Sequence, residues 1–109
     1  MISHRPEQER GKRTAYGIVH TFVGGTQEQY EATVAVVHPA GGGLPAGQIF
    51  RAAGPSAEGW TVVAIHDSKE DWESFRDTVL RPAMMSGVEG GLTTHPTEIA
   101  FEVHDQQSA

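Results

Sequence analysis

Two histidines lie near the ends of predicted strands, in TAYGIVHTFV (His20) and in GWTVVAIHD (His66). A histidine ordinarily changes charge near neutrality, so an imidazole in a cavity can remove a proton from an organic molecule or return one. Tyr16 shares a strand face with His20 and would orient a carbonyl or phenolate oxygen, and Trp60 would stack on a flat ring. We take His66, His20 and Tyr16 as candidate catalytic residues and Trp60 as a candidate substrate-binding residue.

Two further side chains are candidates for substrate binding. Arg51 lies in the strand GQIFRAAG, where it would bind a substrate carboxylate or pair with a surface acid. Met84, in LRPAMM, would line the mouth of a cavity as adaptable apolar surface or pack within a loop.

The histidines also have two alternative interpretations. His20, His66 and Glu98, with His95 in reserve, have the ligand types of a site with two histidines and one carboxylate, which would hold iron or another metal. No local sequence motif accompanies this set. In the other interpretation His20 and His66 are hydrogen-bonded structural residues without chemistry.

Composition limits the classes of partner. The 109 residues suffice for one domain. The formal charge of −6, with only eight Lys and Arg, argues against nucleic acid and anionic membranes as partners. The chain has no Cys, no apolar run typical of a signal peptide and no stretch of about 20 apolar residues. We expect a cytoplasmic protein, and six Arg beside two Lys with no Asn suggest a GC-rich bacterial genome.

Hydrophobic periodicity predicts an α+β domain over residues 14–105, with a flexible tail at 1–13 and a short C-terminal tail at 106–109. The first helix begins at a capping box of Thr26 and Gln29 and ends at His38. The expected order is strand, helix, strand, strand, helix, strand, the ferredoxin-like βαββαβ plan. It implies a four-stranded antiparallel sheet with two helices on one face, its strands over residues 14–23, 47–54, 60–67 and 97–104.

The second helix is expected to begin at Ser68, with Asp71 in the third position, and to end at Arg81 before a proline. Its buried stripe is predicted to be Trp72, Phe75 and Val79. The strand before it is apolar on both faces, although two helices can cover only one face of the sheet. The sequence therefore predicts a homodimer that packs sheet against sheet.

The segments FVGGTQEQYEA, GWTVVAIHDSKEDWESF and FRDTVLRPAM resemble small bacterial members of the dimeric α/β-barrel superfamily, a resemblance that covers residues 16–104. This superfamily includes antibiotic-biosynthesis monooxygenases, muconolactone-type isomerases, haem-degrading monooxygenases and a plant polyketide cyclase. The resemblance implies a homodimeric α/β barrel with His66 in the barrel cavity, not in the helix layer. We further expect the first and third strands to be parallel neighbours, with His20 and His66 close together and Glu98 near them.

The sequence departs from the family's functional residues. The three histidines of the cyclase-type members correspond here to Tyr16, Trp60 and Met84, and the chain has no Asn, which many of the monooxygenases use. This disfavours haem degradation and leaves a cavity with its own histidines.

The resemblance and the histidines together predict a small enzyme that acts on an aromatic or polyketide-like, enolisable substrate without a cofactor. It would be a cofactor-independent monooxygenase or an isomerase or cyclase, and its partners would be a second copy and a small-molecule ligand. The alternative is a non-catalytic ligand-binding or stress-associated barrel. An open pocket favours the enzyme, and a cavity filled by side chains favours the alternative.

Overall fold

The computed structural model describes residues 14–108, so the tail predicted over residues 1–13 lies outside the described part of the chain. The order of elements confirms the predicted α+β plan and is compatible with a ferredoxin-like fold. The elements are β1 (Tyr16–Val23), α2 (Gln27–Val37), β2 (Gln48–Ser56), β3 (Gly59–His66), α3 (Lys69–Phe75), the π-helical turn η1 (Arg76–Leu80), α4 (Arg81–Ser86) and β4 (Thr97–Glu102).

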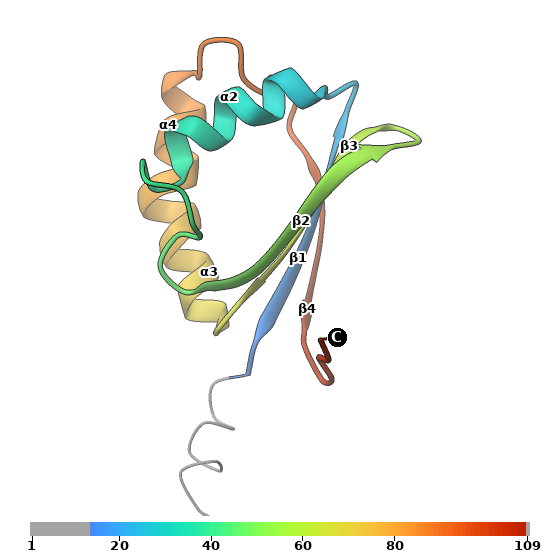
Figure 1. Ribbon diagram of the computed structural model, residues 1–109, viewed down its shortest axis with the longest axis vertical. Coiled ribbons are helices and arrows are strands. Elements are labelled where there is room, and N and C mark those ends of the chain that lie inside the picture. The colour runs from blue at the N-terminus through green and yellow to red at the C-terminus, as the bar shows by residue number, and fades with distance from the viewer. Residues whose placement is uncertain (1–13, 109) are drawn as a thin grey trace, which may run out of the picture.

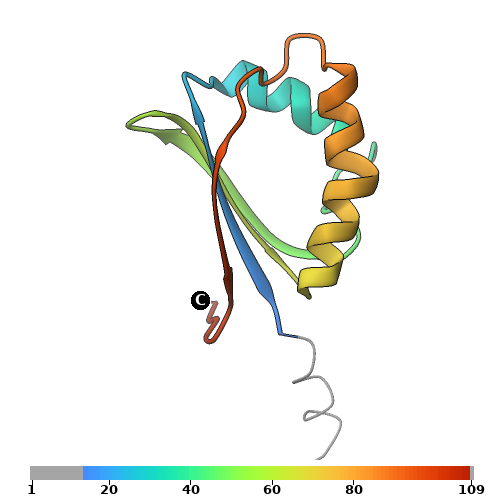
Figure 2. The same cartoon turned by 180° about the vertical axis from the view of Figure 1, so that it is seen from behind.

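The four strands form one antiparallel sheet in the order β2-β3-β1-β4. Helix α2 and the continuous column α3-η1-α4 lie on one side of this sheet, and no helix of residues 14–108 lies on the other side (Figures 1 and 2). Among residues 14–108, no helix has both the length and the apolar character that crossing a membrane requires.

Helix α2 begins and ends where its sequence predicts. The Thr26 hydroxyl accepts a hydrogen bond from the Gln29 backbone N–H, and the Gln29 side chain accepts one from the Thr26 backbone N–H, both at 3.1 Å. This reciprocal pair satisfies two of the N–H groups that a helix start leaves free. At the other end of the helix, the His38 N–H donates to the Val34 carbonyl and completes the last turn.

The second helix begins at Ser68 as predicted, because its hydroxyl accepts from the Asp71 N–H at 3.1 Å. Its predicted end at Arg81 is wrong: the column continues through Pro82 and ends at Gly87, whose φ is +87°. Proline disrupts a regular helix because it lacks an N–H and its ring crowds the preceding turn. Here Pro82 lies in the first turn after η1, where the π turn has already replaced the regular backbone hydrogen bonds of an α-helix.

The same π turn changes which side chains are buried. Trp72 and Phe75 are buried as predicted, but Val79 is 37% exposed, and Leu80 packs against the core in its place. A π turn contains one more residue than the regular spacing assumes, so the buried stripe moves on by one position.

The hydrophobic core lies between the sheet and the helices. Ile18 of β1 packs with Val37 of α2 and with Trp72 and Phe75 of α3. Because alternate residues of a strand share a face, the helix-facing side of β1 is the one that includes His20.

The central strands β1 and β3 are antiparallel, so the predicted parallel pairing is wrong. A tight hairpin makes β3 antiparallel to β2, and β3 lies between β2 and β1. In the observed register His66 pairs with Tyr16, whereas His20 pairs with Val62. The two histidines therefore lie four residue pairs apart along the central strands.

Candidate functional site

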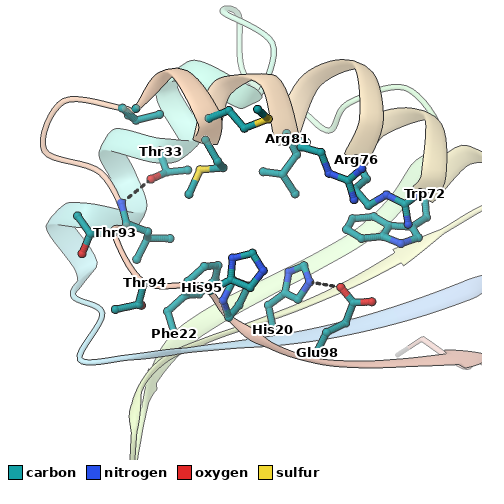
Figure 3. A pocket seen from close by; sticks show the side chains of 17 residues that line it. His20, Phe22, Thr33, Trp72, Arg76, Arg81, Thr93, Thr94, His95 and Glu98 are labelled. Atoms are coloured by element: carbon teal, nitrogen blue, oxygen red, sulfur yellow. Dashed lines mark hydrogen bonds and ion pairs between the residues drawn. The ribbon is translucent and has the colours of Figure 1, made fainter.

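A pocket of about 620 Å³ lies between the helix-facing side of the sheet, the column α3-η1-α4 and the segment that leads to β4 (Figure 3). Its volume is in the range of pockets that hold small organic molecules. It is lined by His20, Phe22, Thr33, Trp72, Arg76, Leu80, Arg81, Met84, Met85, Gly87, Val88, Leu92, Thr93, Thr94, His95, Pro96 and Glu98.

A hydrogen-bonded histidine and glutamate on neighbouring strands lie in the wall of this pocket. His20 of β1 is in register with Glu98 of β4, and Nε2 of His20 lies 2.8 Å from Oε1 of Glu98. A carboxylate only accepts, so Nε2 carries a proton, and in the neutral form of the ring this tautomer has its lone pair on Nδ1. Within residues 14–108 no group forms a hydrogen bond with Nδ1. The His20 side chain is 12% exposed, so it is largely removed from bulk water without being sealed from it.

The His20 ring is held between two aromatic side chains of the pocket wall. Its centroid lies 5.6 Å from that of Trp72 and 6.0 Å from that of Phe22. Trp72 reaches this position because the Ser68 cap starts α3 directly after β3 and the indole is on the helix's buried side. These contacts fix the orientation of the imidazole and provide a flat apolar surface beside it.

Two arginines follow Trp72 along the same wall. Arg76 donates from Nε and Nη2 to the two carboxylate oxygens of Asp77, at 2.8 and 3.2 Å. Nη1 of Arg81 lies 3.4 Å from the same carboxylate. The hydrogen bond from Arg76 lowers the pKa of Asp77 and raises the pKa of Arg76 itself, so both of these groups are charged at neutral pH.

His66 is fully buried and does not line the pocket. The prediction that it points away from the helix layer is wrong, because its ring lies 5.3 Å from Trp72 and 6.0 Å from Phe75. Burial lowers its pKa, and the charge of Asp71 opposes this only in part. The Gln48 amide nitrogen, which can only donate, lies 3.4 Å from Nε2 and so fits a neutral ring.

Three other predicted site residues also lie outside the pocket lining. Trp60 packs against Tyr30 of α2, with ring centroids 5.4 Å apart, and burial raises the pKa of the Tyr30 phenol. Tyr16 packs against the core beside the fully buried Ile18. Arg51 contacts the His38 ring, and burial together with the Arg51 charge lowers the pKa of His38 to about 4.

The predicted metal ligands do not converge. The structure brings His20 and Glu98 together, but the indole of Trp72 contacts both His20 and His66. His95 lines the pocket and lies beside His20 in Figure 3. Across residues 14–108 there is no group of three or more His, Cys, Asp or Glu side chains arranged to hold a metal ion.

No family model, curated protein or solved structure matches this chain. The chemistry of the pocket therefore has to follow from its own side chains. Of the predicted residues, His20, Met84, Glu98 and His95 line it.

Among the residues that the sequence interpretation did not assign to the site are one tryptophan and both arginines of the wall: Trp72, Arg76 and Arg81. The spacing of Trp72 and Arg76 could have indicated that they share a wall, because residues four apart lie on one face of a helix. Arg81 had no such signal, since its position depends on the π turn that precedes it.

Proposed function

We propose that this protein is a small enzyme that transfers protons to and from an enolisable, flat organic substrate held between the sheet and the helices. The observation that supports the proposal best is the His20–Glu98 pair in the wall of the pocket. A positioned imidazole with a carboxylate on one nitrogen and a free lone pair on the other is the arrangement that a general base needs.

In the proposed reaction, Nδ1 of His20 removes a proton from the carbon next to a carbonyl group. The electron pair of the broken C–H bond moves to the carbonyl oxygen, which gives an enolate. Glu98 stabilises the imidazolium that forms, because its carboxylate already accepts from Nε2. Return of the proton to another atom of the substrate completes an isomerisation. Attack of the enolate carbon on a second carbonyl, whose oxygen then takes the proton from the imidazolium, would give a cyclisation.

The walls favour a flat substrate. Trp72 and Phe22 flank the imidazole, so an aromatic or conjugated substrate would stack beside the base. Met84 and Leu80 add apolar surface that can adapt to the outline of a ligand. Oxygenation of such an enolate by molecular oxygen, the cofactor-independent monooxygenase reaction, begins with the same proton transfer.

Proton exchange tests this proposal directly. Phenylpyruvate and its neutral methyl ester are incubated with the protein in D2O, and the loss of their α-proton signals is followed by NMR. We expect His20→Gln to slow the exchange by about 100-fold or more. Glu98→Gln should slow it by about tenfold or more, because the imidazolium loses a charged hydrogen-bond partner.

His104→Gln is the matched control, because His104 is exposed and lies outside the pocket lining. Equal exchange in the wild type, in His20→Gln and in His104→Gln would contradict the proposal. Binding of both ketones without any acceleration of exchange would instead support the non-catalytic ligand-binding barrel.

We also propose that the active form is a homodimer in which two copies pack their sheets together, as in the dimeric α/β-barrel superfamily. The side of the sheet without helices exposes Ile99, Phe101 and Phe50, at 65%, 44% and 42%. By alternation from the buried Ile18, the residues that β1, β3 and β4 present on this side are all uncharged. Two copies of a chain with a charge of −6 can therefore approach through this face without placing like charges in contact.

A further inference from the structure

The pocket differs in charge from the rest of the protein. The chain carries 14 acidic residues against eight basic ones, whereas the pocket lining contains two arginines and a single glutamate. Glu98, the one acid, is already paired with His20. With two arginines against this one carboxylate, the lining carries a formal charge of +1, whereas the whole chain carries −6.

We propose that the natural substrate carries a carboxylate and that Arg76, supported by Arg81, binds it; this inference rests on the proposed function of the pocket. Arg76 lies one helical turn after Trp72, and in Figure 3 both project from the helix column, while His20 and Glu98 project from the strands that face it. An anionic group at Arg76 would thus place the attached flat body beside the indole and its enolisable carbon near the imidazole.

The hydrogen bonds of Arg76 leave room for such a ligand. A guanidinium has five N–H groups, and the contact with Asp77 uses only Nε and one N–H of Nη2. Among residues 14–108, nothing accepts from Nη1. Asp77 holds the guanidinium plane in one orientation, and it does not itself line the pocket. A fixed plane with free donors is the geometry in which arginine recognises carboxylates.

This placement replaces the predicted role of Arg51. Arg51 is on the helix-facing side of β2, but its guanidinium contacts the His38 ring, and it is not part of the pocket lining. Arg76 and Arg81 are the two arginines that line the pocket.

The test compares 2-naphthoate with 2-naphthamide, which has the same shape without the charge, by isothermal titration calorimetry on the full chain. We expect the wild type to bind 2-naphthoate about tenfold or more tightly than 2-naphthamide, and Arg76→Gln to remove this preference. Arg81→Gln should reduce it by a smaller factor, since Arg81 is more exposed and contacts Asp77 through one nitrogen. Added NaCl should weaken binding of 2-naphthoate more than binding of 2-naphthamide.

Lys69→Gln is the matched control, because it removes one positive charge from an exposed residue outside the pocket. It should leave the preference unchanged. His20→Gln should also retain it, so that carboxylate binding and proton transfer are separated.

Each other outcome is decisive. Equal affinity for the two probes, or a preference that survives both arginine substitutions, would overturn the carboxylate inference and leave the proposed function standing. Absence of binding by either probe, together with absence of proton exchange, would overturn both. Loss of proton exchange in His20→Gln with no preference for 2-naphthoate would retain the enzyme and exclude the anionic substrate.

Discussion

Trp60 and Trp72 both lie on the helix-facing side of the sheet, but only Trp72 borders the pocket. Trp60 is covered by Tyr30 of α2, while Trp72 contacts His20. The two tryptophans of the chain can therefore report separately on the pocket and on the packing beneath α2.

The first prediction uses this separation. An aromatic ligand in the pocket should quench the fluorescence of Trp60→Phe, in which Trp72 is the remaining indole. It should leave Trp72→Phe nearly unchanged, because the indole of Trp60 is outside the lining. Quenching of Trp72→Phe with none in Trp60→Phe would place the ligand elsewhere.

The second prediction concerns His66, which is 0% exposed and packed between Trp72 and Phe75. His66→Ala should lower the free energy of unfolding by about 2–4 kcal/mol, because it leaves a cavity and an unpaired Gln48 amide. Urea denaturation measures this change, and the exposed His104→Ala should stay within about 0.5 kcal/mol of wild type. A His66→Ala protein as stable as His104→Ala would show that the imidazole is not part of the packed core.

The third prediction is a loss of stability in acid. Folding lowers the pKa of His38 from 6.5 to about 4, so between these values the unfolded chain binds a proton that the folded chain does not. The free energy of unfolding should be highest above pH 6.5 and fall as the pH is lowered toward 4. The lowered pKa of His66 acts in the same direction.

Urea denaturation of wild type and His38→Gln across this pH range provides the measurement. The substitution should flatten the pH dependence, and His104→Gln should not. An equal slope in all three proteins would contradict the assignment to His38.

The fourth prediction tests the dimer. Ile99→Glu places a charge on the side of the sheet that carries no helix, where the residue is 65% exposed in one copy. Sedimentation at micromolar concentration should show a dimer for wild type and a monomer for this variant, since a buried unpaired charge is costly. Val36→Glu, on α2 at 56% exposure, makes the same chemical change on the helix surface and should remain dimeric. A wild-type monomer would exclude the sheet-to-sheet interface.

Much of the fold could be predicted because its signals are local. The Thr26 and Gln29 capping box, the Ser68 cap and the alternation of β1 each depend on residues close in sequence, and the structure confirms all three. The relative direction of β1 and β3 depends on how the connections cross the sheet, and this part of the prediction was wrong.

The candidate site was only partly predictable for the same reason. His20 and Glu98 were both identified from residue type, and strand register brings them together. His66 was assigned to the barrel cavity, away from the helix layer, by the resemblance to the dimeric α/β-barrel superfamily. Its own strand is apolar on both faces and does not reveal which face the helices cover. Arg76 was overlooked although it lies four residues after Trp72, and Arg81 was overlooked because no local pattern indicates a π turn.

The extra residue of η1 also gives this part of the helix tolerance to a change in chain length. The turn Arg76–Leu80 holds one residue more than a regular turn, so removing one residue from it would restore regular helical spacing and leave the residues beyond it in their present positions. Each residue of a regular helix advances the next by about 100°, so the same removal elsewhere in the column would rotate everything beyond it by that angle. A single-codon deletion of Thr78, which lies on the exposed side of this turn, would thus keep both arginines in the wall and leave every pocket residue in the gene.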